Sequence, residues 1–202
     1  MGENSKSNTL YDKAERGEID LLLKYEYDPR RFFATPILSE RLAVAMPESM
    51  VTERLLPYAL NREELIGKSY PEEKEFSDPT LFSDISFIKL GKHSATYERM
   101  SRILGDYSIS PYVVENVSHT AMHYNMMREG LGAVMLSDVH VMTSNLFDER
   151  IRYFVPSSEQ SKRNLYILEK RNAPKNPIAE AFIKTALEFC AYLEREAIPT
   201  EA

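Results

Sequence analysis

One stretch of the sequence, residues 113–138, constrains the fold more than any other. It reads VVENVSHTAMHYNMMREGLGAVMLSD. The apolar run before Asn116 suits a buried strand, and Asn116 and Ser118 are both good helix N-caps. A helix is expected to follow and to end at Gly130, after which the apolar run 131–136 suits a second buried strand. This pattern predicts a β-α-β unit with parallel strands and a right-handed crossover.

The same alternation of strands and helices extends along the rest of the chain. Apolar runs predict further strands at residues 19–23, 38–46, 85–90, 151–155 and 164–170. Helical spacing, caps and glycine stops predict further helices at residues 7–17, 61–66, 95–104, 139–143 and 177–195. Such alternation is typical of an α/β fold with mostly parallel sheets.

Two of these predicted helices have faces that the sequence assigns to the core. In the first helix, Leu10 and Ala14 are expected to point inward. In the last helix, Asn176 and Pro177 form a strong helix start, and six apolar residues follow at helical spacing. These six are Ile178, Phe182, Ile183, Ala186, Leu187 and Cys190. We expect them to form one packed face.

The bulk composition describes an ordinary globular chain of 202 residues. Its 25 Lys and Arg against 31 Asp and Glu give a net charge of −6, which argues against direct contact with DNA by this chain. The one cysteine, Cys190, cannot form an internal disulfide, which suits a reducing cytoplasm. The N-terminus lacks an apolar signal core, and no segment is long and apolar enough to span a bilayer, so we expect a cytoplasmic chain without membrane contact.

Four segments, in order, resemble the effector-binding domain of LysR-type transcriptional regulators. They are RGEIDL from Arg16, LSERLAVAMP from Leu38, the strand-helix-strand stretch with ENVS and EGLGAVML, and NLYILEK from Asn164. The resemblance covers most of residues 7–195. It implies the architecture of type 2 periplasmic binding proteins, with two Rossmann-like α/β subdomains joined by two crossover strands and a cleft between them.

The resemblance also implies the division of the chain. The first subdomain would take residues 1–46 and 170–202, and the second would take residues 47–169. The family's domain opens with a strand and a helix before the segment that residues 7–20 resemble, and they have no counterpart here. Three explanations stay open: the chain is a fragment, the sheet is rearranged, or a partner chain fills the gap.

The first candidate binding site is the turn 92–94, after the predicted strand 85–90. A turn from strand to helix presents free backbone amides, and the helix dipole favours an anion there. Lys92 adds a charge and Ser94 a hydroxyl, with His93 between them. On the residues alone, the plainer interpretation is that Ser94 caps the helix and Lys92 is solvated. The resemblance implies instead that this turn lines the effector cleft.

The second candidate site is the turn 116–119, with Asn116, Ser118 and His119. Capping is again the plain alternative for Asn116 or Ser118 taken singly. Ligands in open α/β sheets sit outside the carboxyl ends of strands, so the two turns are expected to face one cleft. The resemblance adds Thr35, which precedes a crossover strand where members of the family often have a polar residue lining the cleft.

A metal site and an enzyme active site are both less well supported. His119 and His123 are four residues apart, as two metal ligands on one helix face would be, but no third ligand is evident, and a surface pair is the better interpretation. We therefore predict no metal and no cofactor. The sequence has no Gly-x-Ser-x-Gly elbow, no Walker phosphate loop and no dinucleotide fingerprint, so we predict no enzyme.

The function expected from the resemblance is effector sensing within a LysR-type regulator. The chain would bind a small anionic molecule and form homo-oligomers, with Met122, Met126 and Met127 offering core filling or an interface. DNA contact would belong to an N-terminal helix-turn-helix that this sequence lacks. A stand-alone solute-binding protein of the same fold is the first alternative, and a small α/β enzyme, for example a transferase or a deaminase-like protein, is the second.

Overall fold

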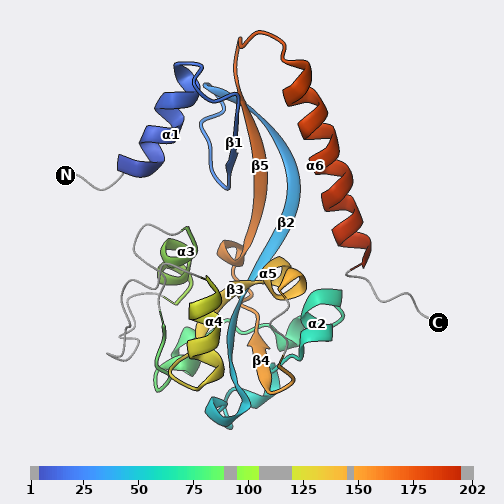
Figure 1. The fold of residues 1–202 in the computed structure, drawn as a ribbon. Coiled ribbons are helices and arrows are strands. Elements are labelled where there is room, and N and C mark those ends of the chain that lie inside the picture. The colour runs from blue at the N-terminus through green and yellow to red at the C-terminus, as the bar shows by residue number, and fades with distance from the viewer. Residues whose placement is uncertain (1–4, 89–94, 105–119, 145–147, 197–202) are drawn as a thin grey trace. The chain divides into compact units, whose positions relative to one another are not determined.

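The computed structural model describes residues 5–88, 95–104, 120–144 and 148–196, and the chain divides into two compact units (Figure 1). Unit 1 consists of Met1–Ser39 and Arg163–Glu196, and unit 2 contains Glu40–Lys162. Strands β2 (Phe32–Pro47) and β5 (Lys162–Lys170) pass from one unit to the other. The subdomain limits proposed from sequence, 46/47 and 169/170, lie farther along these same strands.

Unit 1 combines helix α1 with three strands. α1 (Ser5–Glu15) is followed by Gly17, whose φ of +74° is the left-handed stop that the sequence predicted. β1 (Leu21–Lys24) pairs antiparallel with β5, and β5 lies beside β2 in the sheet. Each of these four elements supplies one residue to a small buried cluster, namely Ala14, Leu22, Phe32 and Leu168.

One residue of α1 departs from the prediction. Leu10 was expected to point inward but is 41% exposed, whereas Tyr11 packs against the buried cluster and its ring lies 5.4 Å from that of Phe32. The prediction was wrong because a shift of one residue turns a helix by about 100°, which moves Leu10 off the inner face and brings Tyr11 onto it. Ala14 is buried, as predicted.

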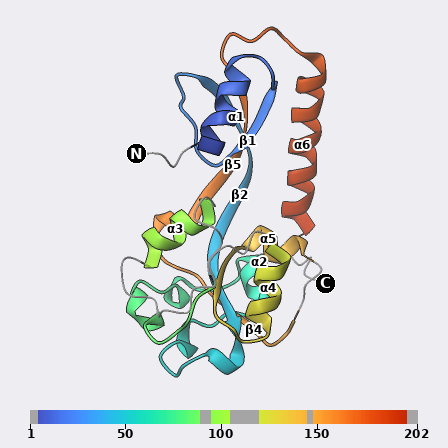
Figure 2. The same ribbon diagram turned by 60° about the vertical axis from the view of Figure 1, so that its left-hand side comes forward.

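The last helix of unit 1 is α6 (Pro177–Glu196; Figure 2), and only part of its predicted face is turned inward. Its start is as predicted, because the Asn176 side chain accepts a hydrogen bond from the backbone N–H of Ile178 at 3.0 Å. Of the six residues predicted to pack, Cys190 is buried and Ile183 and Ala186 are partly buried, but Ile178, Phe182 and Leu187 are exposed. The prediction for these three was wrong because apolar residues lie on nearly every side of this helix, and periodicity cannot say which side packs.

Unit 2 is built on the continuation of β2. Antiparallel ladders join β2 to β3 (Val134–Ser137) and to β4 (Ile151–Phe154). The α-helices are α2 (Arg62–Gly67), α3 (Ala95–Leu104), α4 (Thr120–Arg128) and α5 (Asp138–Thr143). Short 3₁₀ helices lie between them: η1 (Glu48–Met50), η2 (Leu56–Tyr58), η3 (Glu72–Lys74), η4 (Pro79–Phe82) and η5 (Glu159–Ser161).

The two cores of unit 2 follow from the alternation of side chains along β2. Ala43 and Ala45 belong to one cluster of thirteen buried residues, to which α2, α4 and α5 contribute. Leu42, Val44 and Met46 belong to a second cluster of thirteen, to which η4 and α3 contribute. Because successive residues of a strand point to opposite faces, the sheet of unit 2 is covered on both sides.

The direction of the strands is the main correction to the predicted fold. Strand-helix alternation predicted mostly parallel sheets, but the described ladders are antiparallel, because they are the ladders of the crossover strands β2 and β5. The parallel pairing predicted for this region is present as a single parallel bridge between Phe87 and Ala133. Phe87 lies within the expected strand 85–90, and Ala133 lies just before β3. The first strand of the predicted β-α-β unit, at residues 111–114, lies outside the described residues.

Candidate functional site

Six of the seven predicted site residues lie outside the described part of the chain. They are Lys92, His93, Ser94, Asn116, Ser118 and His119. The seventh, Thr35, lies in β2 and is half-buried. What the structure does describe are the elements that lead into and out of the two predicted turns: Ile88 before the first, α3 after it, and α4 after the second.

A hydrogen bond ties together the flanks of the two turns. His123, on the first turn of α4, lies with its Nε2 atom 2.7 Å from the backbone carbonyl of Ile88. The segment that ends at Ile88, before the predicted turn 92–94, and helix α4, after the predicted turn 116–119, are therefore neighbours. Ile88 also donates its N–H to the Ala133 carbonyl at 2.8 Å, and Ala133 donates to the Ser86 carbonyl at 2.7 Å.

Gly132 allows this close pairing of the segments around Ile88 and Ala133. A Cβ atom built at Gly132 would lie 3.0 Å from the Ser86 carbonyl oxygen and 3.1 Å from Ile88 Cγ1. Backbone atoms cannot move aside as a flexible side chain does, so glycine is needed at this position. Gly130, two residues earlier, has a φ of +76° and ends α4 as the sequence predicted.

His123 is a buried neutral imidazole and not the surface residue that the sequence predicted. It is 1% exposed, and burial lowers its pKa below the ordinary value of 6.5. Because the Ile88 carbonyl only accepts, Nε2 must carry the proton, which leaves Nδ1 as a lone-pair acceptor. Nδ1 is buried without a hydrogen-bond partner in the structure. The spacing of the apolar residues on this helix was the signal that could have indicated the burial of His123. Tyr124 and Met127, on the same side of the helix, are buried core residues.

A second buried polar group lies where β3 meets α5. The Asp138 carboxylate accepts hydrogen bonds from the backbone N–H groups of Arg41 at 2.9 Å and Val139 at 2.8 Å. Burial raises its pKa above the ordinary 3.8, against the lowering effect of these bonds and of Lys68. His140, two residues after Asp138, is a further histidine whose pKa is lowered by burial, as for His123. Among the described residues, no three His, Cys, Asp or Glu side chains gather to hold a metal ion.

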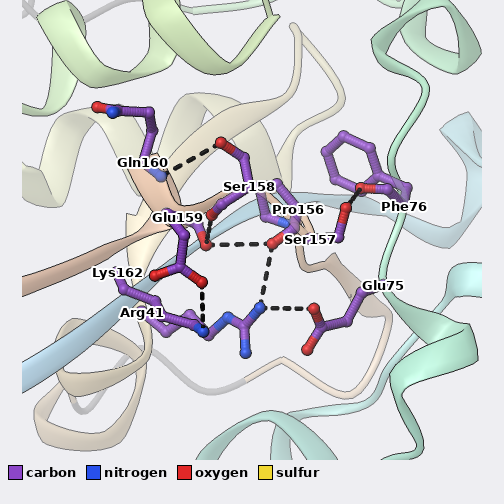
Figure 3. Close-up of polar contacts among 10 residues, drawn as sticks. Arg41, Glu75, Phe76, Pro156, Ser157, Ser158, Glu159, Gln160 and Lys162 are labelled. Atoms are coloured by element: carbon purple, nitrogen blue, oxygen red, sulfur yellow. Dashed lines mark hydrogen bonds and ion pairs between the residues drawn. The ribbon is translucent and has the colours of Figure 1, made fainter.

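A network of polar contacts surrounds the connection 156–162, which leads into β5 (Figure 3). Arg41, on β2, donates through Nη2 to Glu75 Oε2 at 2.7 Å and to the Pro156 carbonyl at 3.2 Å. The Ser161 hydroxyl donates to the carbonyls of Pro156 and Ser158. These bonds fix the connection 156–162 against β2.

Helix α3 is held to this same connection by Arg99. Its Nη1 atom donates to the carbonyls of Gln160 at 3.0 Å and Lys162 at 3.2 Å. Met100 and Leu104 are buried on the adjacent face of the helix. The helix that follows the turn 92–94 is thus fixed to the beginning of β5. No sequence pattern pointed to Arg41 or Arg99, because their partners are backbone carbonyls and a carboxylate far away along the chain.

Comparison with known proteins identifies the family. A family model described as LysR substrate binding domain matches residues 3–191. The chain belongs to this family. LysR substrate-binding domains are regulatory domains of transcription regulators, so the resemblance read from the four sequence segments is confirmed. No curated protein sequence matches the chain.

Solved structures show the same fold. The regulatory domain of Synechocystis PCC6803 CcmR, solved with 2-PG, has a TM-score of 0.64 and 16% identity over 90% of this chain and 78% of that chain. The reduced OxyR regulatory domain of Pseudomonas aeruginosa has a TM-score of 0.62 and 19% identity over 91% and 79%. The QuiR effector-binding domain, solved with shikimate, has a TM-score of 0.60 and 15% identity over 92% and 78%. The predicted periplasmic-binding-protein-like fold is therefore confirmed.

A membrane-spanning helix is not found in the described parts of the LysR domain, where none of the helices combines the necessary length and apolar character.

Proposed function

We propose that this LysR domain senses a small anionic effector at the turns 92–94 and 116–119 of unit 2. The observation that supports this most directly is the 2.7 Å contact between His123 Nε2 and the Ile88 carbonyl. It holds the segment at Ile88, before the first predicted turn, beside helix α4, which follows the second predicted turn. Two neighbouring structures of the same fold, CcmR and QuiR, were solved with small molecules bound.

The chemistry expected at these turns favours an anion. Helices α3 and α4 begin directly after them, and the free N–H groups and positive dipole end of a helix start attract negative charge. Lys92 would add a full positive charge, and the hydroxyls of Ser94 and Ser118 would fix the orientation of the ligand. Asn116, His93 and His119 supply further hydrogen-bonding groups in the same two turns.

The proposed sensing also offers a route by which a bound effector acts on the rest of the chain. Arg99 holds α3 to the carbonyls of Gln160 and Lys162 at the start of β5. A ligand that repositions the start of α3 would shift these contacts with it. LysR-type regulators contact DNA through a separate N-terminal domain, and the net charge of −6 on these 202 residues is in keeping with a sensing role for this domain.

Calorimetric titration tests the proposed site. Inorganic phosphate, acetate and shikimate are titrated into the wild-type chain and into Ser94→Ala and Ser118→Ala variants. Each variant is expected to bind about ten- to a hundredfold more weakly, because a hydrogen bond to a charged group contributes roughly 1.5–3 kcal/mol. Ser101→Ala is the matched control, because Ser101 is an exposed hydroxyl on α3 away from its start.

Two results would contradict the proposal. Either none of the three anions binds, or one binds and both turn variants retain its wild-type affinity. Thr35→Ala is examined in the same titrations, because Thr35 remains a predicted ligand contact whose contribution is separable from that of the turns. Loss of binding in Thr35→Ala alone would move the site away from unit 2.

A further inference from the structure

His123 carries a buried hydrogen-bond acceptor for which the described residues supply no donor. Its side chain is 1% exposed, and its Nδ1 atom has no hydrogen-bond partner. Because Nε2 donates to the Ile88 carbonyl, Nδ1 presents a lone pair and can only accept. Buried polar groups of native proteins are almost always hydrogen-bonded, so an acceptor left open in this way points to a donor from outside the chain.

The contacts of Ile88 fix this acceptor in place. Ile88 donates its N–H to the Ala133 carbonyl at 2.8 Å and accepts from His123 at 2.7 Å, so the imidazole is held by a segment that is itself paired. If the proton moved to Nδ1, the lone pair of Nε2 would face the carbonyl oxygen, which disfavours that tautomer. Burial keeps the ring neutral because it lowers the pKa of His123, and the nearby His140 adds to this effect.

The position of His123 on α4 places the acceptor beside the start of that helix. His123 lies in the first turn, and a side chain on a helix leans toward the N-terminus and covers the turn before its own Cα. The first N–H groups of a helix have no partner within it, and its dipole favours an anion there. An anion attracted to the start of α4 and a donor that reaches Nδ1 would therefore be neighbours.

A second histidine with an open buried nitrogen, His140, lies in a different setting. Its Nε2 atom also has no partner. The chain itself serves the start of its helix, α5, because the Asp138 carboxylate accepts from the Val139 N–H. The Ser137 hydroxyl accepts from the N–H of His140. An anion from outside would meet the Asp138 carboxylate there, whereas the first turn of α4 has no acidic residue. Of the two histidines, His123 is the one placed to meet an anionic ligand.

We propose that Nδ1 of His123 accepts a hydrogen bond from the effector, and that the effector is therefore an anion with a hydroxyl group beside its charged group, such as a 2-hydroxy acid. This inference rests on the anion sensing proposed above and narrows the class of ligand. The carboxylate takes the N–H groups at the start of α4, and the hydroxyl donates to Nδ1. An ammonium group could also donate, but the positive end of the helix would repel it. A simple carboxylate leaves Nδ1 buried and open, so the site discriminates against it.

Calorimetric titration of the 202-residue chain with matched ligands tests this preference. Glycolate and L-lactate are compared with acetate and propionate, which lack only the hydroxyl group, and L-alanine carries an ammonium group in its place. Each hydroxy acid is expected to bind about tenfold more tightly than its partner, or better, because a buried acceptor left unpaired costs that much. L-Alanine is expected to bind no better than propionate.

Two substitutions of His123 separate the roles of its two nitrogens. His123→Gln places an amide N–H near the position of Nε2 and keeps the bond to Ile88 but removes the acceptor, so the preference for the hydroxy acid should disappear. His123→Asn places an amide oxygen near the position of Nδ1, so the preference should persist while the bond to Ile88 is lost. His140→Gln is the matched control and should keep the wild-type preference. Circular dichroism checks that each variant is folded.

Nitrogen-15 NMR of the histidine side chains reads the proposed bond directly in the wild type. A lone-pair nitrogen that accepts a hydrogen bond moves upfield, so the Nδ1 resonance of His123 should move when L-lactate is added and should move less when propionate is added. If His123 only stabilised the fold, the two ligands would have the same effect on this resonance.

Four outcomes would overturn the inference. The hydroxy acids bind no better than their partners, or L-alanine binds better than L-lactate, or His123→Gln keeps the wild-type preference, or the Nδ1 resonance is already upfield in the free chain and unmoved by L-lactate, as a buried water would make it. Absence of binding by every probe would instead contradict the anion site itself, and this inference would fall with it.

Discussion

Units 1 and 2 differ in how much of their apolar surface is buried and in how it is covered. Unit 2 has a sheet covered on both faces, with thirteen buried residues in each of two clusters. Unit 1 has a cluster of four, while its largest helix keeps three aromatic rings at least half exposed. The apolar residues of α6 are as numerous as those of a good core helix, so apolar content by itself does not make a core. In unit 2, each apolar face of the sheet packs against a second layer of structure. Unit 1 has fewer such layers, so more of its apolar surface stays exposed.

The largest effect that separates the units is expected from truncating one phenylalanine in each. Phe82 is 1% exposed and packs against the rings of Phe76, Phe87 and Phe154, with centroids 4.8–6.0 Å away. Phe82→Ala should destabilise unit 2 by about 3–5 kcal/mol. Phe32→Ala should cost unit 1 less, about 3 kcal/mol or below, because its smaller cluster can collapse around the gap.

Urea unfolding followed by amide hydrogen exchange resolves which unit each variant weakens. Phe82→Ala should speed exchange in β3 and β4, and Phe32→Ala should speed it in β1 and β5. Equal losses, spread over both units in each variant, would mean that the two units unfold as one and that the contrast drawn here has no energetic meaning.

A glycine pair sharpens the same contrast at a smaller scale. Gly132→Ala places a methyl group 3.0 Å from a backbone oxygen, so the paired segments must shift, which costs about 1–3 kcal/mol. Gly17→Ala meets no atom within 4 Å and costs only the strain of its φ of +74°, about 1 kcal/mol. Because Gly132 also sits beside Ile88, its variant should additionally weaken anion binding, which the same calorimetric titration measures. A Gly132→Ala chain with wild-type stability and affinity would show that the pairing tolerates displacement.

The smallest expected effect is a difference in pH response. All four histidines lie between residues 40 and 162, and burial lowers the pKa of both His123 and His140 below 6.5. The unfolded state therefore binds more protons than the folded state just below pH 6.5. The stability that these residues give unit 2 is complete above that pH and is lost as the pH falls through their lowered pKa values. Unit 1 has no group of this kind.

The measurement compares urea midpoints for each unit at about pH 7.5 and about pH 5.5, on either side of the ordinary histidine pKa. The midpoint of unit 2 should fall more than that of unit 1, and His123→Gln should reduce the difference while keeping an N–H for the Ile88 carbonyl. Asp138 acts in the opposite sense: its raised pKa gives stability that is lost as the pH rises above 3.8. A steeper acid response in His123→Gln than in wild type would contradict the assignment.

Local features of this chain were predictable from sequence, and choices between faces were not. Asn61, Ser137 and Asn176 each cap a helix, Asn176 as predicted, and the Asn61 side chain forms a full capping box with Glu64. These devices act within four residues, so the sequence contains all the information. The outward turn of Phe182 depends on which side of α6 meets another element, and that element is far away in the chain. His123 was missed for the same reason, since its partner is a carbonyl 35 residues earlier.

The path of the chain through the two units also sets the order in which they can be completed. Unit 1 begins the sequence, but its β5 and α6 come from Arg163–Glu196, after all of Glu40–Lys162. When the ribosome has released residue 162, all the described strands and helices of unit 2 have emerged, while the opening segment of unit 1 still lacks β5 and α6. Domains usually mature from the N-terminus onward. This chain reverses that order, because its first 39 residues cannot complete unit 1 until residues 163–196 have been synthesised. Helix α6, with its exposed apolar side chains, is the last helix of unit 1 to be synthesised.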